Sequence, residues 1–575
     1  MLVSLLKNEL KKTLFIINFT ITTMEQNNSV QKRVSLNFVY LLSSKFFLLF
    51  VFVCTLSSNL NAQITSSNID VKWSEELHPV KSRFMEDMGI LKSDENYIYY
   101  LWNTDLGDTY NQFMWSTSVE YLVKFDRKNN KNTLVELKLK TDRVKRNVIK
   151  VSLIGNSIHV ISTLIDKKQK KCYVLDETVD METFKLKNDA HKISEIDYNG
   201  IKGIDEKKIY VNFSIYKDRI LFDYNFDSSI GSYYGFEVFN KPMSSEWKFK
   251  DKAQAGSGIT FEGQYVFDND GNLYASLRNF ENERDANRHY ERSKLFIKFY
   301  PKDGSQPKIQ EVKLPGNKFV TAQQLAVNDK NELICAGLYA IQGNESAVGA
   351  FSVISTPRLQ LMGSFNDKAF DNAFLTKGLN SKDAANLENK SADGKEFEED
   401  FTYKFNNIHF RNDGGFDLVA EKCKLLIETI FNSQQGTTYR YYHTYDDILV
   451  LTCNSDGSFN WVQRIPKNQY VVNVYHFLGS YLLSYGQNDE MNFMYNLIKT
   501  NRFTKKPTDE SKIVMLSLDS NGKESFKELF TDFKLTNSIC PKFSVSLGES
   551  KYLISRINMN TIGKNTLFFG EMKLN

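Results

Sequence analysis

One short pattern occurs eight times along the sequence: a turn rich in glycine, asparagine or aspartate, followed by a run of alternating apolar residues. Residues 268–272 (DNDGN) before LYASL and residues 411–415 (RNDGG) before FDLVAE are two examples. Gly, Asn and Asp tolerate positive φ angles, so such turns are typical of β-hairpins. The eight turns are residues 92–96, 154–157, 205–208, 268–272, 328–332, 411–415, 478–480 and 547–550.

A second pair of strand-like runs follows each of the first seven turns, as in residues 448–453 and 459–465. Two hairpins make a four-stranded antiparallel sheet, and sheets repeated along a chain are typical of β-propellers. The 43 Phe and 29 Tyr residues agree with this, because aromatic residues favour strands. The sequence therefore predicts an all-β fold, a closed β-propeller of eight blades. Seven is the alternative count, because the first and last units are the weakest.

The eighth unit lacks one strand, and a spare strand precedes the first unit. Residues 567–574 are the only strand-like run in its second half, and residues 69–73 (IDVKW) remain unassigned. In a closed propeller the start of the chain commonly supplies the missing strand, which removes the exposed edges of an open array. We therefore expect the N-terminal and C-terminal strands to share the last blade.

The repeat is interrupted once, between the fifth and sixth units. Residues 364–400 contain apolar residues at loosely helical spacing and end in the acidic run EFEED. We expect a surface insertion that is partly helical. It divides the propeller into a first part, residues 63–363, and a second part, residues 401–575.

An export signal precedes the repeats. Residues 46–56 (FFLLFVFVCTL) form an apolar run with basic residues before it and Ala62 after it, the order of a secretory signal peptide. The run is too short to span a bilayer, which takes about 20 apolar residues. We expect residues 1–62 to be the signal region. Residues 1–23 are either an unusually long n-region or, as we favour, a segment upstream of the true start. The mature chain is expected in the periplasm, at the cell surface or outside the cell, without a transmembrane helix.

The net charge of +4 resides in the signal region, which holds six basic and two acidic residues. The rest of the chain has 67 basic and 67 acidic residues and is neutral. A neutral chain has no overall electrostatic attraction to nucleic acid or to an acidic membrane. The basic run at residues 167–171 (KKQKK) lies between two strand-like runs and is interpreted as a charged turn. We therefore expect no nucleic-acid partner.

Local motifs of catalysis or metal binding are lacking in the sequence. The seven histidines form no HxH or HExxH pattern, and no G-x-S-x-G elbow, P-loop or dinucleotide fingerprint occurs. Residues 268–272 resemble the start of a calcium loop but are one residue short, so we interpret them as a turn. The five cysteines after the signal lie in apolar runs and are predicted to be buried, with one disulfide as the alternative. We expect no metal and no cofactor, and assign no catalytic residue.

One segment favours recognition of a ligand. Residues 437–447 (TTYRYYHTYDD) concentrate tyrosine, arginine and histidine, and Tyr and Arg are enriched at binding hot spots. The alternative is a strand extension whose tyrosine rings merely cover the sheet. The candidate binding residues are Tyr439, Arg440, Tyr441, Tyr442, His443 and Tyr445.

Two hairpins carry a resemblance to known proteins. Residues 448–465 and 513–529 resemble the strand–D-x-x-G–strand hairpins of many bacterial propellers, in which Gly457 and Gly522 would form the turns and Trp461 would pack between blades. The chain resembles uncharacterised secreted β-propellers of Gram-negative envelopes. This resemblance implies a propeller fold and an envelope location, and it implies no activity.

These observations favour a non-catalytic binding or scaffold protein of the cell envelope with a protein partner. It could serve as an accessory subunit of an outer-membrane transport or secretion complex. The alternative is a protein that acts on or binds glycans, such as a propeller hydrolase or lyase. A hydrolase would need carboxylates from different blades about 5–10 Å apart.

Overall fold

The computed structural model describes residues 65–574 with gaps. The predicted signal region, residues 1–62, and most of the predicted insertion lie outside the described residues. The gaps are residues 67–70, 76, 78–86, 105–118, 142–143, 207–208, 217, 229–230, 242, 255–258, 281–292, 343, 361, 379–401, 433–435, 499–511, 531–537, 549 and 560–564.

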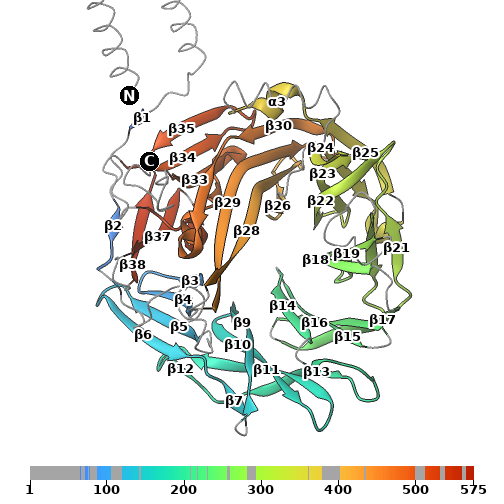
Figure 1. Ribbon diagram of the computed structural model, residues 1–575, viewed down its shortest axis with the longest axis vertical. Coiled ribbons are helices and arrows are strands. Elements are labelled where there is room, and N and C mark those ends of the chain that lie inside the picture. The colour runs from blue at the N-terminus through green and yellow to red at the C-terminus, as the bar shows by residue number, and fades with distance from the viewer. Residues whose placement is uncertain are drawn as a thin grey trace, which may run out of the picture. The chain divides into compact units, whose positions relative to one another are not determined.

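Strands make up nearly all the regular structure of the described part. Eight sheets of four to six strands follow one another in chain order around a common centre (Figure 1), and we number them 1 to 8. Most consecutive strands within a sheet pair antiparallel, which is the arrangement that the repeated hairpins predict. The described part is therefore nearly all-β and has a β-propeller fold.

Sheets 1 to 4 hold the strands from residue 87 to residue 311. Sheet 1 contains β3 (Asp87–Ser93), β4 (Tyr97–Thr104), β5 (Val119–Asp126) and β6 (Lys131–Glu136), and sheet 2 contains β9 (Asn147–Ile154), β10 (Ser157–Asp166), β11 (Lys171–Asp180), β12 (Lys185–Leu186) and β13 (His191–Asp197). Sheet 3 contains β14 (Tyr210–Ile215), β15 (Arg219–Ser228), β16 (Gly231–Asn240) and β17 (Ser245–Gln254), and sheet 4 contains β18 (Ile259–Phe267), β19 (Leu273–Phe280), β20 (Ser293–Tyr300) and β21 (Lys308–Glu311). A separate ribbon joins β7 (Lys140–Thr141) to β8 (Val144–Lys145).

Sheets 5 to 8 hold the remaining strands, including two from the start of the described chain. Sheet 5 contains β22 (Lys318–Val327), β23 (Leu333–Ile341), β24 (Asn344–Ser355) and β25 (Met362–Ala369), and sheet 6 contains β26 (Thr402–Phe405), β27 (His409–Phe410), β28 (Phe416–Asn432), β29 (Gly436–Cys453), β30 (Phe459–Ile465) and β31 (Gln469–Val472). Sheet 7 contains β32 (Leu482–Tyr485), β33 (Met491–Leu497), β34 (Lys512–Leu518), β35 (Glu524–Glu528) and β1 (Thr65–Ser66), and sheet 8 contains β36 (Val545–Gly548), β37 (Lys551–Met559), β38 (Asn565–Lys573) and β2 (Lys72–Trp73).

Helical turns are short in the described part. They are α3 (Asn372–Thr376), η4 (Pro357–Leu359), η5 (Asn473–Leu478), η6 (Gln487–Asp489) and η8 (Pro541–Phe543). The predicted insertion thus begins inside β25, which completes sheet 5, and continues into α3. In this described part no helix has both the length and the apolar character needed to cross a membrane.

Six of the eight predicted turns join two paired strands at the start of a sheet, and two do not. Residues 205–208 precede β14, and the first hairpin of sheet 3 is instead formed by β14 and β15. Residues 478–480 precede β32, and the turn of sheet 7 lies at residues 486–490. Both predictions were one strand early, because a polar turn looks the same before a hairpin and within it.

The features that carried the resemblance are confirmed locally. Gly457 and Gly522 both have positive φ, 85° and 77°, as their hairpin turns require. Trp461 packs between sheets 6 and 7, where its Nε1 donates to Ser520 O at 3.0 Å. A Cβ on Gly522 would come within 3.0 Å of the Trp461 ring, so the glycine also makes room for the tryptophan.

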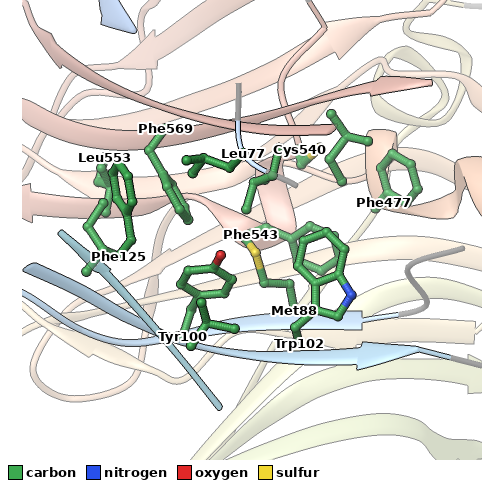
Figure 2. Close-up of a cluster of buried hydrophobic side chains, with 14 of the residues drawn as sticks. Leu77, Met88, Tyr100, Trp102, Phe125, Phe477, Cys540, Phe543, Leu553 and Phe569 are labelled. Carbon is green, nitrogen blue, oxygen red and sulfur yellow. The ribbon is translucent and has the colours of Figure 1, made fainter. Parts of the chain in front are cut away.

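The core of the described part includes eight apolar clusters that each lie between two neighbouring sheets. Figure 2 shows the cluster that joins sheet 8 to sheet 1. The ring of Phe569 from β38 lies 5.3 Å from that of Tyr100 and 5.9 Å from that of Phe125, both in sheet 1. The first and last sheets therefore pack as neighbours, in the same way as sheets adjacent in the sequence.

The start of the described chain adds strands to the last two sheets. In sheet 8, β2 pairs antiparallel with β38, with Lys72 opposite Glu571 and Trp73 opposite Gly570. The indole of Trp73 lies over the guanidinium of Arg556, 4.5 Å from the ring centroid. In sheet 7, β1 pairs parallel with β35, which the sequence had not predicted.

Candidate binding site on the β28–β29 arm

The longest described strands are β28 and β29 of sheet 6. From Leu425 onward on β28, and up to Tyr441 on β29, the strand pairing of the described residues runs between these two strands. We call residues 425–441 the arm. In Figure 1 its long curved strands reach from sheet 6 across the inside of the ring in that view. No third strand of the described part pairs with this ribbon, and residues 425–429 are exposed on both of its faces.

A β-bulge marks the point where the arm leaves the sheet. One residue of β28, Lys422, lies opposite two residues of β29, Asp446 and Asp447. A bulge of this kind bends a strand and increases its twist. The bulge therefore accounts for the divergence of the arm from sheet 6.

The arm carries large apolar side chains that are exposed to solvent. Isolated apolar residues are common on protein surfaces, but a group of them is typical of an interaction site. The group consists of Leu425 (53% exposed), Leu426 (54%), Ile427 (50%), Phe431 (78%) and Tyr439 (41%).

One face of the arm also carries a polar and aromatic group. Arg440 lies opposite Glu428 across the two strands, with Nη1 3.5 Å from Glu428 Oε2. The hydroxyl of Tyr442 donates to the same carboxylate, and its ring stacks on that of Tyr470 at 5.8 Å. Arginine, glutamate and two tyrosine rings thus share one face near the base of the arm.

The structure distributes the predicted binding residues over both faces and the base of the arm. Because side chains alternate along a strand, Tyr439, Tyr441 and His443 share one face and Arg440 and Tyr442 the other. Tyr445 is 4% exposed and belongs to the base. Its hydroxyl accepts from Lys542 Nζ at 2.6 Å. The six residues are close in space, but they do not form a single surface.

A buried polar network holds the base of the arm. Lys467 Nζ donates to Glu421 Oε1 at 2.7 Å, to Gln469 Oε1 at 2.9 Å and to Tyr445 O at 3.2 Å. Glu421 Oε2 accepts from Ser480 Oγ at 2.7 Å. The network ties β28 and β29 to the segment that includes β31, and so fixes where the arm emerges.

Two titratable groups at the base have shifted pKa values. Burial, together with His476 and Lys542, lowers the pKa of His443 to about 4. Burial, together with the neighbouring charge of Asp447, raises the pKa of Asp446 to about 6. Both groups favour their neutral forms because both lie where solvation of a charge is reduced.

Several other buried charges of the described part form ion pairs. In sheet 2, His159 Nδ1 lies 2.9 Å from Asp176 Oδ2, and Arg146 Nη2 lies 2.5 Å from Glu177 Oε2. The turn at residues 268–272 joins β18 to β19. In the described residues no group of three or more His, Cys, Asp or Glu side chains is placed to hold a metal. The five described cysteines are buried and free, as predicted.

Sequence reasoning identified β29 of the arm and missed β28. Residues 425–431 (LLIETIF) supply four of the five exposed apolar side chains. The sequence did contain a sign of the longer strand, because this run continues the strand-like FDLVAE beyond the length of other strands in the repeat. The network around Lys467 had no local signal, since its members are up to 59 residues apart.

Comparison with known proteins assigns this chain to no family. No protein-family model matches it, and no curated protein sequence matches it. A polysaccharide lyase structure is similar at 10% identity, covering 90% of this chain and 94% of that one, with a TM-score of 0.30. The acylaminoacyl peptidase of Pyrococcus horikoshii has 10% identity, coverages of 84% and 59%, and a TM-score of 0.31. An alpha-L-arabinofuranosidase of Fusarium graminearum, complexed with arabinobiose, has 7% identity, coverages of 88% and 98%, and a TM-score of 0.31.

Proposed function

We propose that this protein is a non-catalytic binding protein that recognises another protein with the β28–β29 arm. The observation that carries the proposal is the group of five large apolar side chains, 41–78% exposed, on a ribbon with which no other described strand pairs. Exposing such a group to water is unfavourable, at roughly 25 cal/mol for each Å² of apolar surface. A partner that covers the arm would recover this free energy.

The kinds of side chain on the arm favour a protein partner. Leu425, Ile427 and Phe431 offer aliphatic and aromatic surface, and Arg440 and the tyrosines are residue types enriched at hot spots. Aliphatic side chains bind well to apolar protein surfaces. They offer little to a sugar, which needs aromatic faces and hydrogen-bond partners.

A glycan is the second candidate ligand, and one observation favours it. The stacked rings of Tyr442 and Tyr470 lie beside Glu428 and Arg440, so an aromatic surface adjoins charged hydrogen-bonding groups. Such a group can stack on a sugar ring and bind its hydroxyls. This ligand would use the opposite face of the arm from Tyr439 and Tyr441.

Crosslinking from the arm tests the first proposal. A photoreactive amino acid at position 427 of the mature chain should crosslink to one specific partner in extracts of the source cells. Phe431→Ser and Leu425→Ser should abolish that product. Ile309→Ser is the matched control, because Ile309 is 56% exposed on sheet 4. Equal crosslinking by the arm variants and the control would overturn the proposal.

A glycan array separates the second candidate from the first. Binding to a glycan that is lost in Tyr442→Ala and kept in Tyr210→Ala would support the glycan ligand. Tyr210 is the control because it is an exposed tyrosine on another sheet, sheet 3. Crosslinking to a protein without glycan binding would exclude it.

We also propose that the chain is exported and that its eight sheets form a closed ring of eight blades. The apolar run at residues 46–56 supports export, and an N-terminus at Gln63 in the mature protein would test it. The pairing of β2 with β38 and the cluster between sheets 8 and 1 support closure. Periplasm, cell surface and exterior are all consistent with such a signal.

A further inference from the structure

One edge of β29 pairs with β28, and the other, which we call the outer edge, has a neighbouring strand along only part of its length among the described residues. The strand β31 pairs antiparallel with β29 from Tyr442, opposite Val472, to Tyr445, opposite Gln469. After Val472 the chain turns into η5 and leaves this edge. Among the described residues, no strand continues the line of β31 beside Gly436–Arg440. The backbone groups that point outward there are available for another strand.

The short strand β31 shows what this edge accepts. It is four residues long, and its sequence QYVV mixes polar, aromatic and β-branched residues. Tyr470 lies opposite Thr444, and its ring reaches that of Tyr442 on the same face. The edge of β29 therefore already binds one strand of alternating side chains through ordinary antiparallel pairing.

The free part of the edge lacks two of the usual protections against strand addition. Natural edge strands are commonly kept short, charged, interrupted by proline or bulged. Residues 424–445 contain no proline, and the ladder between Cys423 and Asn432 on β28 and their partners on β29 is continuous. This regular edge, residues 436–440 (GTTYR), can bind a further strand, and its one charged side chain, Arg440, favours a strand that carries the opposite charge.

We infer that the protein partner supplies an extended segment that pairs with Gly436–Arg440 as the next strand in line with β31. This inference rests on the proposed function and specifies the partner's chemistry. The side chain of Arg440 is 48% exposed, with the carboxylate of Glu428 across the strand pair on β28 and the Tyr442 hydroxyl two residues along on β29. An incoming carboxylate would flank Arg440 from the outer edge. Apolar or aromatic residues next to that carboxylate in the segment would then face Tyr439.

The bound segment is therefore an extended peptide with a central acidic residue between apolar or aromatic neighbours. Main-chain hydrogen bonds supply much of the affinity in this mode, and alternate side chains supply the specificity. Opposite charges directly across two strands stabilise the pairing, and like charges destabilise it.

Synthetic peptides and the mature full chain test this inference. The probe is a ten-residue peptide of alternating Val and Thr with a central Glu flanked by two Tyr. One control peptide has Lys in place of Glu, and another keeps every side chain but is N-methylated at alternate residues. We expect the Glu peptide to bind at least about tenfold more tightly than either control, a difference of about 1.4 kcal/mol. Hydrogen exchange at residues 436–440 should slow when it binds.

Charge reversal at Arg440 provides the test variant, and charge reversal at Arg358 provides its control. Arg440→Glu should reverse the preference, so that the Lys peptide binds more tightly than the Glu peptide. Arg358→Glu, at an exposed arginine of η4, should leave the preference unchanged. Equal binding of the N-methylated peptide, or no slowing of exchange at residues 436–440, would overturn strand addition. Crosslinking from position 427 could still succeed in that case, so failure of this inference is distinguishable from failure of the proposed function.

Discussion

Lys467 Nζ lies 2.7 Å from Glu421 Oε1, and the side chains of both residues are buried beneath the base of the arm. Burial lowers the pKa of Lys467, and the carboxylate of Glu421 opposes that effect. An ion pair in such a place gains its stability from the other hydrogen bonds around it, here from Gln469 and Ser480. Its position couples the arm to the rest of sheet 6.

Removal of one member of this pair should strongly destabilise the protein. Lys467→Met leaves the Glu421 carboxylate buried without its cation, and we expect a loss of about 3–5 kcal/mol in the free energy of unfolding. The double variant Lys467→Met, Glu421→Gln should recover part of that loss. Urea denaturation measures both. Arg358→Met, which breaks an exposed pair with Asp270, is the control and should change stability by about 0–1 kcal/mol. Equal effects of the two single variants would contradict this role for Lys467.

Protonation of His443 should destabilise the protein in mild acid. Its pKa of about 4 in the folded protein lies below the value of about 6.5 expected when unfolded. The unfolded chain therefore binds the proton more readily, and stability falls as the pH drops from about 6.5 to 4. His443→Phe keeps a ring beside Tyr445 and His476 and should remove this part of the pH dependence. Denaturation midpoints at several pH values between 7 and 4 provide the measurement, and parallel curves would rule the effect out.

Titration of Asp446 should change the stability with pH in the opposite direction to that of His443. Its pKa of about 6 in the folded protein exceeds the value of about 3.9 expected when unfolded, so stability falls as the pH rises from about 4 to 6. Asp446→Asn should therefore stabilise the protein at pH 7, and the gain should vanish below about pH 4. Asp447→Asn is the matched control in the same bulge. It loses the 2.6 Å ion pair with Arg464 and should destabilise instead. If both variants destabilise at pH 7, burial of the Asp446 charge is not unfavourable.

The strand β2 should stabilise the last sheet. Trp73→Ala removes the ring that lies over Arg556 and beside Gly570, where a Cβ would come within 2.8 Å of the indole. We expect a loss of about 1–3 kcal/mol and a lower melting temperature. Deletion of residues 65–75 should have a larger effect, because it also leaves the edge of β38 unpaired. Leu547→Ala, at a 45% exposed position of the same sheet, is the control. Equal melting temperatures of the truncated and intact proteins would mean that β2 contributes nothing to the sheet.

Much of the strand pattern was predictable because its causes are local. Turns such as residues 411–415 need residues that tolerate positive φ, and Gly414 has a φ of 83°. Strands such as β23 and β37 show as apolar runs because both of their faces are buried between sheets. The predictions for residues 205–208 and 478–480 were wrong because the same turn chemistry serves inside a hairpin and ahead of it.

The sequence by itself determined the secondary structure, its repeated four-stranded units and the aromatic segment of β29. The tertiary structure alone decided which residues meet. The contacts of Glu421 with Lys467 and with Ser480 bring together residues that no local pattern links. The exposure of Leu425 and Phe431 was likewise decided at this level, because an apolar strand is buried or exposed according to whether another sheet covers it. Alternation and turn propensity act over a few residues, whereas packing acts between segments that only the fold makes neighbours.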